Sequence, residues 1–172
     1  MSLIDIILSR RSIRRYEKKE IPQDVLNKIL EAGRLAPSAS NRQPWHFIVV
    51  TDDDIKKKIA QTGDSMFIKD APIIIAGCGL IGDDYTRKWG TSWTIIDISI
   101  ALQNMVLAAW AMGIGSCWIG DFLEEEVKDL LIVSDDWKIV SLLALGYPAK
   151  QPMPRNKKSM KEIVSFNKFK QS

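Results

Sequence analysis

The sequence predicts an α+β fold, in which several helices surround four or five strands. The chain has 172 residues and is 46% hydrophobic, which is enough for the core of one globular domain over residues 1–172. Short β-branched runs typical of buried strands lie at 46–50, 72–79 and 137–147 ("HFIVV", "PIIIAGCG" and "WKIVSLLALGY"). The helical segments between them do not alternate regularly with these runs, which favours α+β over a doubly wound α/β arrangement.

Two helices are expected before the first strand. Ser2 and Asp5 have the spacing of a capping box, so a short apolar helix should run over residues 3–8. This helix leads directly into the arginine-rich segment "SRRSIRRYEKK" (9–19). Pro22 is suited to the first turn of a second helix, which carries one apolar face and packs on the core.

The longest predicted helix, "TSWTIIDISIALQNMVLAAWAM" (91–112), is apolar nearly all round, and Gly113 follows it as a C′ residue. Asp97 interrupts the run and no Lys or Arg flanks it closely, so we expect a buried helix rather than a membrane span. A helix so apolar in so small a domain also indicates that another subunit covers one of its faces.

The two remaining helices are predicted to begin at acidic residues. Asp52 precedes a charged helix that follows the first strand. Asp121 and Glu124 have the spacing of a second capping box, so we expect a helix from there to about Val133. The last strand, 137–147, follows this helix directly.

The charge is unevenly distributed along the chain. Residues 1–50 contain nine basic and five acidic residues. Residues 51–148 contain eight basic and fifteen acidic residues, and residues 149–172 contain seven basic residues and one acidic residue. Nucleic-acid binding is disfavoured because the middle is acidic and the aromatic residues lie in apolar runs rather than among Lys and Arg. The two basic ends of the chain are therefore either solvent-exposed surface or segments that bind a small anion.

Few residues are available for metal or acid–base chemistry. Cys78 and Cys117 are far apart and lack metal-ligand spacing, so we expect no metal site, no disulfide and a reducing, cytoplasmic environment. His46, the single histidine, begins a strand, where a partly buried structural role is expected. Because no catalytic triad can be built without it, we predict no catalytic side chain, and a cofactor must carry any reaction.

Four arginines occupy positions 10–15, with Ser12 and Ile13 between them. The planar guanidinium group matches the oxygens of a phosphate, and a nearby hydroxyl adds another donor. A solvated surface is the alternative for any run of charge. The predicted phosphate cradle consists of Arg10, Arg11, Ser12 and Arg14.

Two further segments have the composition of a binding site. "APSASNRQPW" (36–45) concentrates small and polar residues between two prolines just before a strand, although a plain connecting loop is the alternative. "GIGSCWIG" (113–120) combines three glycines with an aromatic residue, so that backbone N–H groups can approach a flat ligand closely. A strand loosened by its glycines is the alternative there.

Three long motifs carry a family resemblance. They are "RRSIRRYEKKEIPQDVLNKILEAGRLAPSASNRQPWHFIVV" (10–50), "WTIIDISIALQNMVLAAWAMGIGSCWIGDF" (93–122) and "LALGYPAKQPMPRNKKSMKEIV" (143–164). With these three motifs in this order, the chain resembles the nitroreductase family of FMN-dependent oxidoreductases. The resemblance extends from about Ile4 to Val164. The resemblance implies an α+β fold with a central mixed sheet, an intertwined homodimer with two FMN sites at the subunit interface, and NADH or NADPH as electron donor.

The resemblance also assigns site residues. Arg10, Arg11, Ser12 and Arg14 correspond to the segment at the FMN phosphate and ribityl chain, with Arg14 able to reach the pyrimidine edge of the ring. Pro37, Ser38, Ala39 and Asn41 correspond to a loop that the other subunit lays against the same flavin. Trp118, Ile119 and Gly120 correspond to the strand that lines the ring, with the Gly120 amide as a donor to flavin N5. Arg155 and Lys157 correspond to a basic pair that closes on the phosphate.

The activity implied is NAD(P)H-dependent reduction of nitroaromatics, quinones or related small electron-poor acceptors by a ping-pong mechanism. A cation near flavin N1 raises the reduction potential, which is the role expected of Arg14. Alternatives are a relative acting on enones or halogenated aromatics, and a non-catalytic flavin-binding module. Trp89 or Trp93 could cover the site, with ordinary packing as the alternative for each.

Overall fold

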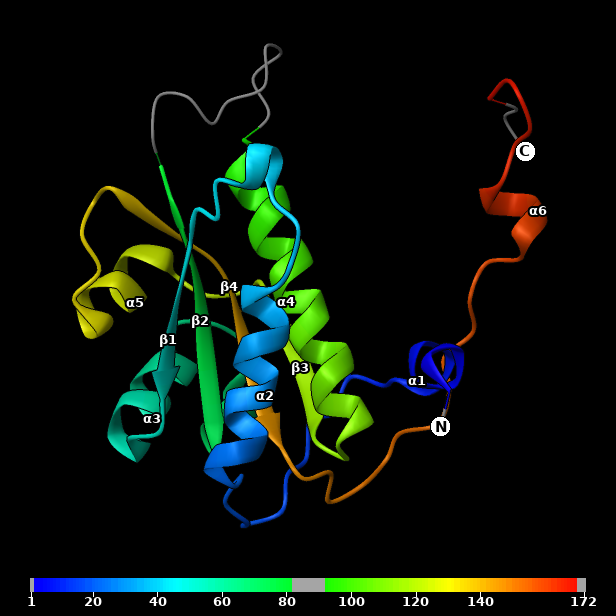
Figure 1. Ribbon diagram of the computed structural model, residues 1–172. Coiled ribbons are helices and arrows are strands. Elements are labelled where there is room, and N and C mark those ends of the chain that lie inside the picture. The colour runs from blue at the N-terminus through cyan, green and yellow to red at the C-terminus, as the bar shows by residue number, and fades with distance from the viewer. Residues whose placement is uncertain (1, 82–91, 170–172) are drawn as a thin grey trace.

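In the part of the chain that the structure describes, four strands form one sheet at the centre of the molecule (Figure 1). The computed structural model describes residues 2–81 and 92–169. The strands are β1 (Trp45–Val50), β2 (Ile73–Leu80), β3 (Gly115–Ile119) and β4 (Trp137–Gly146), in the order β1-β2-β4-β3. Every neighbouring pair is antiparallel, so the four strands do not form the mixed sheet that was predicted. A parallel pairing is present as an isolated bridge between Ser12 and Ser116.

Helices cover both faces of this sheet (Figure 1). α2 (Gln23–Arg34) and α4 (Trp93–Ala111) lie on one face, and α3 (Asp53–Gln61) and α5 (Glu124–Leu131) lie on the other. The short elements are α1 (Leu3–Ser9), η1 (Ala39–Asn41), η2 (Met66–Asp70) and α6 (Met160–Ile163). The predicted α+β class is confirmed.

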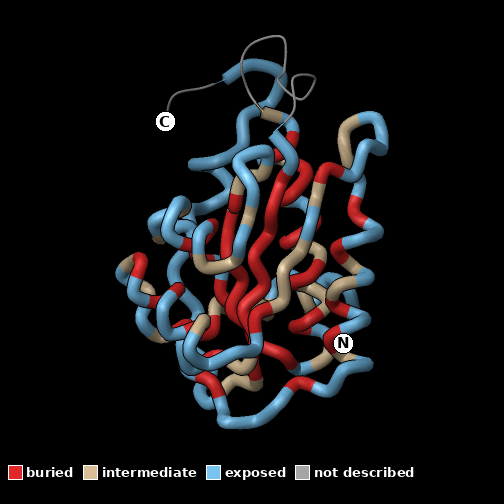
Figure 2. Tube along the Cα trace, turned by 90° about the vertical axis from the view of Figure 1, so that its left-hand side faces the viewer, coloured by how far each residue is buried: buried red, intermediate tan, exposed pale blue. Residues whose placement is uncertain are grey.

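The two central strands, β2 and β4, are apolar on both faces because both faces are covered. Along β2, Ile73 and Ile75 pack against α2 and α4, whereas Ile74 and Ala76 pack in the cluster that includes α3 and α5. Figure 2 shows the resulting band of buried residues through the middle of the molecule. The sheet is therefore a rigid support on which loops and strand ends can hold a site.

Local capping signals predicted several helix boundaries correctly. The Ser2 hydroxyl accepts from the Asp5 N–H at 3.2 Å and the Asp5 carboxylate accepts from the Ser2 N–H at 2.9 Å, which completes the capping box of α1. Asp52 caps α3 by accepting from the Ile55 N–H at 2.9 Å. Gly113 follows α4 with a φ of 78°, a conformation that glycine adopts without steric cost.

The capping box predicted at Asp121 and Glu124 is wrong. α5 begins at Glu124, and the side chain of its N-cap, Leu123, makes no capping bond. The Asp121 carboxylate instead accepts from the Asp64 N–H at 3.1 Å. The Glu124 carboxylate accepts from the Ile139 N–H at 2.9 Å, so it joins the helix to β4. Both carboxylates therefore bind residues far away in the sequence, although their local spacing predicted that they would cap the helix.

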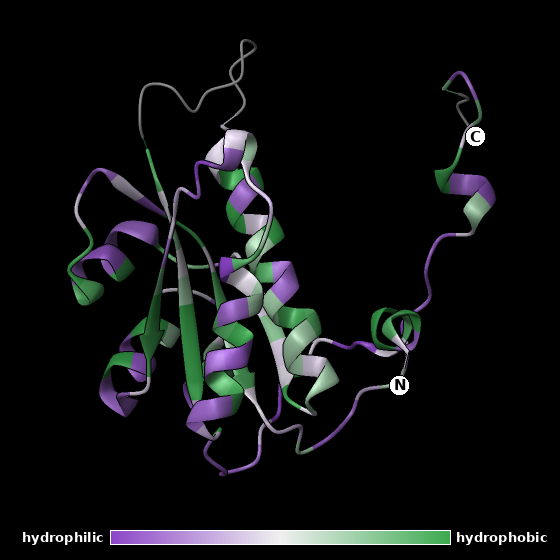
Figure 3. Ribbon diagram, viewed as in Figure 1, coloured by the Kyte–Doolittle hydropathy of each residue, from purple (hydrophilic) through white to green (hydrophobic). Residues whose placement is uncertain are grey.

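α4 is a long and largely apolar helix, and it runs alongside α2 (Figure 3). It is long and apolar enough to cross a membrane by length and composition, but half of that stretch is buried inside the domain. Its inner face packs on α2 and the sheet, as in the core helix of a soluble fold. The predicted start of this helix at Thr91 lies outside the described residues.

Beyond β4 the chain leaves the body of the domain (Figure 1). Residues 149–169 form a C-terminal arm in which every residue is exposed, including those of α6. Several of the exposed side chains are large and apolar: Met153, Met160, Ile163, Val164, Phe166 and Phe169. In water such an arm gains little stability from its own chain, so it is suited to packing on another surface.

Candidate functional site

The arginine-rich segment is fixed along the start of β3. Ser12 forms the isolated bridge with Ser116, and the Ile13 N–H donates to the Ser116 carbonyl at 2.8 Å. The Ile13 side chain is completely buried. At the end of α1, the Trp110 indole N–H donates to the Ser9 hydroxyl at 2.9 Å. Backbone pairing and apolar packing therefore hold this charged segment in place.

Tyr16 anchors the far end of the segment from inside the core. Its hydroxyl donates to the Ile13 carbonyl at 2.7 Å, and its ring is buried. Burial raises the pKa of the Tyr16 phenol, because the charged form would lose its water. The group therefore stays a neutral donor and keeps the turn between Ile13 and Tyr16 closed.

The arginines of the predicted cradle have different surroundings. Arg11 donates to the carbonyls of Leu8 and Arg10 at 3.0 and 2.9 Å, so it caps the end of α1. Arg14 is exposed and lies over the Phe67 ring at 5.8 Å from its centroid. Arg14 therefore has a guanidinium group held next to an aromatic face and still open to solvent.

A buried thiol lies beside these cations. Burial raises the pKa of Cys117 in β3, while the positive charges of Arg14 and Arg10 act in the opposite direction. Both arginines are thus close enough to β3 to act on a group inside it.

The end of β3 is open on its outer side. Ile119 is buried, whereas Trp118 is 37% exposed. Among the residues that the structure describes, no atom lies within 4 Å of a side chain added at Gly120, so the backbone there faces open space. The segment at 62–64 closes one flank, since the Leu123 N–H donates to the Thr62 carbonyl at 2.9 Å. An exposed backbone beside a cationic segment is an arrangement that a planar anionic ligand can approach.

The loop 36–45 lies at the other end of α4. The Ala39 N–H donates to both carboxylate oxygens of Asp97, at 3.1 and 3.2 Å. Trp110, which contacts the end of α1, follows Asp97 by thirteen residues on the same helix. At about 1.5 Å per residue, the two contacts are roughly 20 Å apart along the helix axis. One chain therefore does not bring Ser38, Ala39 or Asn41 to its own arginine segment.

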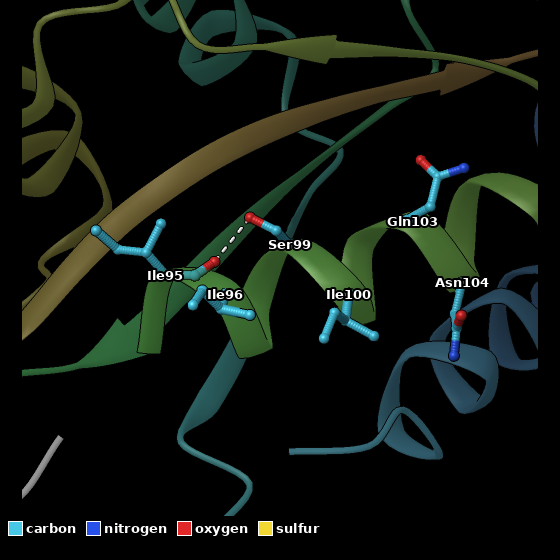
Figure 4. Close-up of a pocket in the computed structure, with 6 residues that line it drawn as sticks. All are labelled: Ile95, Ile96, Ser99, Ile100, Gln103 and Asn104. Atoms are coloured by element: carbon cyan, nitrogen blue, oxygen red, sulfur yellow. Dashed lines mark hydrogen bonds between the residues drawn. The ribbon is translucent and has the colours of Figure 1, made fainter. Parts of the chain in front are cut away.

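The outer face of α4 lies between these two ends. An open groove of about 410 Å³ runs along it, lined by Ile95, Ile96, Ser99, Ile100, Gln103 and Asn104 (Figure 4). In the close-up, the Ser99 hydroxyl donates back to the Ile95 carbonyl of its own helix at 2.7 Å. The groove therefore offers mainly isoleucine side chains to whatever packs on it.

Other predicted residues fall elsewhere. Arg155 and Lys157 lie on the exposed C-terminal arm, where nothing tests their assignment to a phosphate. His46 is exposed rather than partly buried, and its ring meets Trp137 edge-on at 5.8 Å between centroids. Trp93 is also exposed, and Trp89 lies outside the described residues. Within 2–81 and 92–169, no group of three potential metal-binding side chains occurs.

Sequence reasoning missed the part that three residues play in holding these segments. Asp97 was noted for interrupting an apolar helix, and the structure shows that it binds the loop 36–45. Tyr16 and Phe67 hold the arginine segment and gave no local signal. Of the three, only Asp97 could have been identified from the sequence, because a carboxylate inside an apolar helix indicates a specific partner.

Fold and site together define an α+β protein in which a basic segment is fixed along a sheet strand with an open end. The family model for the Nitroreductase family matches residues 7–62 and 59–147. The chain belongs to the nitroreductase family.

Individual relatives agree with this assignment. A Methanothermobacter thermautotrophicus protein named "Putative NADH dehydrogenase/NAD(P)H nitroreductase" is 37% identical over 161 residues, which cover 91% of this chain and 82% of that protein. A nitroreductase family protein from Clostridium difficile 630 has a TM-score of 0.89 and 29% identity, over 98% of this chain and all of that one. An FMN-dependent nitroreductase from Clostridium difficile R20291 has a TM-score of 0.84 and 29% identity, over 96% and 99% of the two chains.

Proposed function

We propose that this protein is a cytoplasmic FMN-dependent NAD(P)H oxidoreductase that acts as a homodimer on nitroaromatics, quinones and related small electron-poor acceptors. Relatives named NAD(P)H nitroreductase, NADPH-flavin oxidoreductase and FMN-dependent nitroreductase support an oxidoreductase that uses FMN and NAD(P)H. The observation that carries the proposal is the arginine segment held on β3 beside the open backbone at Gly120.

The residues at this place fit FMN. Its phosphate carries nearly two negative charges, which Arg10 and Arg14 would pair with, and the Ser12 hydroxyl lies between them in the chain. Charge-assisted hydrogen bonds of this kind are worth about 1.5–3 kcal/mol each. The open space at Gly120 leaves room for the ring, because the position has no side chain to occupy it.

When bound, FMN supplies the capacity to accept a hydride from a nicotinamide and to pass the electrons to an acceptor. Arg14 lowers the energy of negative charge that develops near it and so favours reduction. Nicotinamide and acceptor use the same space in turn, so turnover is ping-pong. No side chain of the chain itself is required as a general acid or base.

Two subunits complete each site in this proposal. Because the loop 36–45 and the arginine segment are about 20 Å apart along α4 in one chain, the loop of one subunit serves the flavin held by the other. The groove on α4 is the surface on which the second subunit packs. The C-terminal arm, with Arg155 and Lys157, crosses to the partner and brings two further cations to the phosphate.

FMN binding is tested by substituting single arginines. We expect Arg10→Ala and Arg14→Ala each to raise the FMN dissociation constant roughly tenfold to a hundredfold, because each removes a charge-assisted contact. Flavin fluorescence titration measures this. Arg34→Ala is the matched control, since Arg34 is an exposed arginine paired with Glu31 at 2.7 Å on α2. Wild-type affinity in both cradle variants would refute the phosphate assignment.

Electron transfer is tested separately. Anaerobic addition of NADH or NADPH should bleach the flavin absorbance, and a panel of nitroaromatics, quinones, enones and halogenated aromatics should restore it at different rates. Flavin that stays oxidised with both nucleotides would identify the protein as a non-catalytic flavin-binding module.

A further inference from the structure

Asp97 has an unusual position for a carboxylate. It lies within α4, a long and largely apolar helix, and is 2% exposed. Both of its oxygens accept from one backbone donor, the N–H of Ala39, which is 58 residues away in sequence. A buried charge is costly unless it is well paired, so a residue that served helix packing would more simply be apolar.

The bond from Asp97 falls on a loop with an unusual backbone. Ser40, Asn41 and Gln43 have φ values of 53°, 54° and 56°, in the left-handed region that side chains other than glycine seldom adopt. Within the loop, the Gln43 N–H donates to the Ser38 hydroxyl at 2.9 Å. Asn tolerates this conformation, but Ser40 and Gln43 adopt it at a steric cost, so the loop needs support from a rigid element such as α4.

The charge of the Asp97 carboxylate is unfavourable in its buried surroundings. Burial raises the pKa of Asp97, because desolvation penalises the charged form, and the Ala39 N–H opposes this only in part. At neutral pH the ionised group therefore makes folding less favourable than a neutral group of the same shape would. Residues retained at a cost to stability are typical of functional positions.

We propose that Asp97 is a positioning residue for the cofactor: it holds the backbone at Ala39 so that Ser38, Ala39 and Asn41 present a fixed surface to the flavin. The inference rests on the proposed function for the identity of the ligand. Asp97 itself touches neither flavin nor substrate and acts through the loop.

Two substitutions test the proposal in the intact dimer. Asp97→Ala removes the acceptor that fixes Ala39 and should raise the FMN dissociation constant, by at most roughly tenfold to a hundredfold, which is the worth of the charge-assisted bond that holds the loop. Asp97→Asn keeps an acceptor oxygen without the charge. It should weaken FMN binding less than Asp97→Ala, while its thermal unfolding midpoint does not fall below that of the wild type. At saturating FMN, kcat of Asp97→Asn should recover.

Hydrogen exchange gives a readout that does not depend on flavin. In protein stripped of flavin, the amides of residues 38–43 should exchange faster in both variants, and Asp24→Asn, which removes an exposed carboxylate on α2, should change neither exchange nor affinity. The proposal would be overturned if Asp97→Ala bound FMN as tightly as the wild type. It would also be overturned if Asp97→Asn lost FMN affinity and stability in parallel while the hydrogen exchange of residues 38–43 stayed unchanged. If Asp97→Ala does not fold, Asp97→Asn decides. A wild type that binds no FMN would refute the proposed function, whereas exchange would still decide whether Asp97 holds the loop.

Discussion

Gly115 shows how a single missing side chain positions the arginine segment. A Cβ built at Gly115 would lie 2.5 Å from Ile13 Cγ1 and 3.0 Å from the Pro148 ring. Real Cβ atoms do not approach other atoms so closely, so Ile13 would have to move. Because Ile13 is fully buried between Ser12 and Arg14, its displacement would carry both residues with it. The glycine was predicted for its approach to a ligand, and its first effect is on the chain's own core.

The Gly115→Ala substitution should therefore lower both stability and cofactor affinity. We expect a loss of about 1–3 kcal/mol in the free energy of unfolding, which is typical of overpacking, together with weaker FMN binding. Denaturant unfolding and flavin titration measure the two effects. Gly120→Ala is the control for stability, since no atom in residues 2–81 and 92–169 would lie within 4 Å of its Cβ. Equal stability of Gly115→Ala and the wild type would contradict the argument.

At the scale of the elements, local signals predicted boundaries, and distant contacts decided the rest. The caps at Ser2 and Asp52 need partners three residues away, so the sequence shows them directly. Asp121 and Glu124 have a local pattern just as good, but their oxygens bind Asp64 and Ile139 across the fold. A capping pattern thus predicts a helix start only where no distant donor competes.

The same limit applies to the candidate site. The segments at 10–14, 36–45 and 113–120 were identifiable because arginine, glycine and proline have local meaning. That the first and third lie side by side follows from the Ser12–Ser116 bridge, which no local pattern encodes. The separation of the second follows from the length of α4. Local composition therefore identified the three candidate segments. That the loop 36–45 serves the other subunit was implied only by the family resemblance, and it stays a prediction that the length of α4 supports.

The C-terminal end of α5 carries a strain that can be relieved. Ile132 has a φ of 56° and is 93% exposed, so a β-branched residue adopts a left-handed conformation without packing in return. We expect Ile132→Gly to raise the free energy of unfolding by about 1 kcal/mol. Ile132→Val, which keeps the branch at Cβ, should bring no gain in thermal denaturation. A lower stability for Ile132→Gly would show that the cap is not strained.

At the scale of the whole molecule, the described part of the chain has three surfaces that are more apolar than a soluble monomer requires. α1 exposes Leu3, Ile4, Ile7 and Leu8, the C-terminal arm is exposed throughout, and α4 presents the groove at Ile95 and Ile100. Contiguous apolar surface of this kind marks an interface. The proposed dimer explains both the exposed apolar surfaces and the distance between the loop 36–45 and the arginine segment of the same chain. The contact that buries the groove also brings the loop 36–45 to the partner's flavin.

A charge placed in the groove should therefore separate the subunits and release the cofactor together. For Ile100→Glu, light scattering should show a species near the chain mass of 19.5 kDa, where the wild type shows twice that mass, and flavin titration should show greatly weakened FMN binding. The buried carboxylate would be unpaired at the interface, which is why one substitution suffices. Ile132→Glu is the matched control, because it adds the same charge at an exposed isoleucine on the opposite face of the sheet. If Ile100→Glu becomes monomeric and still binds FMN as tightly as the wild type, one subunit holds the flavin unaided. The assignment of the loop 36–45 to the partner's site would then be wrong.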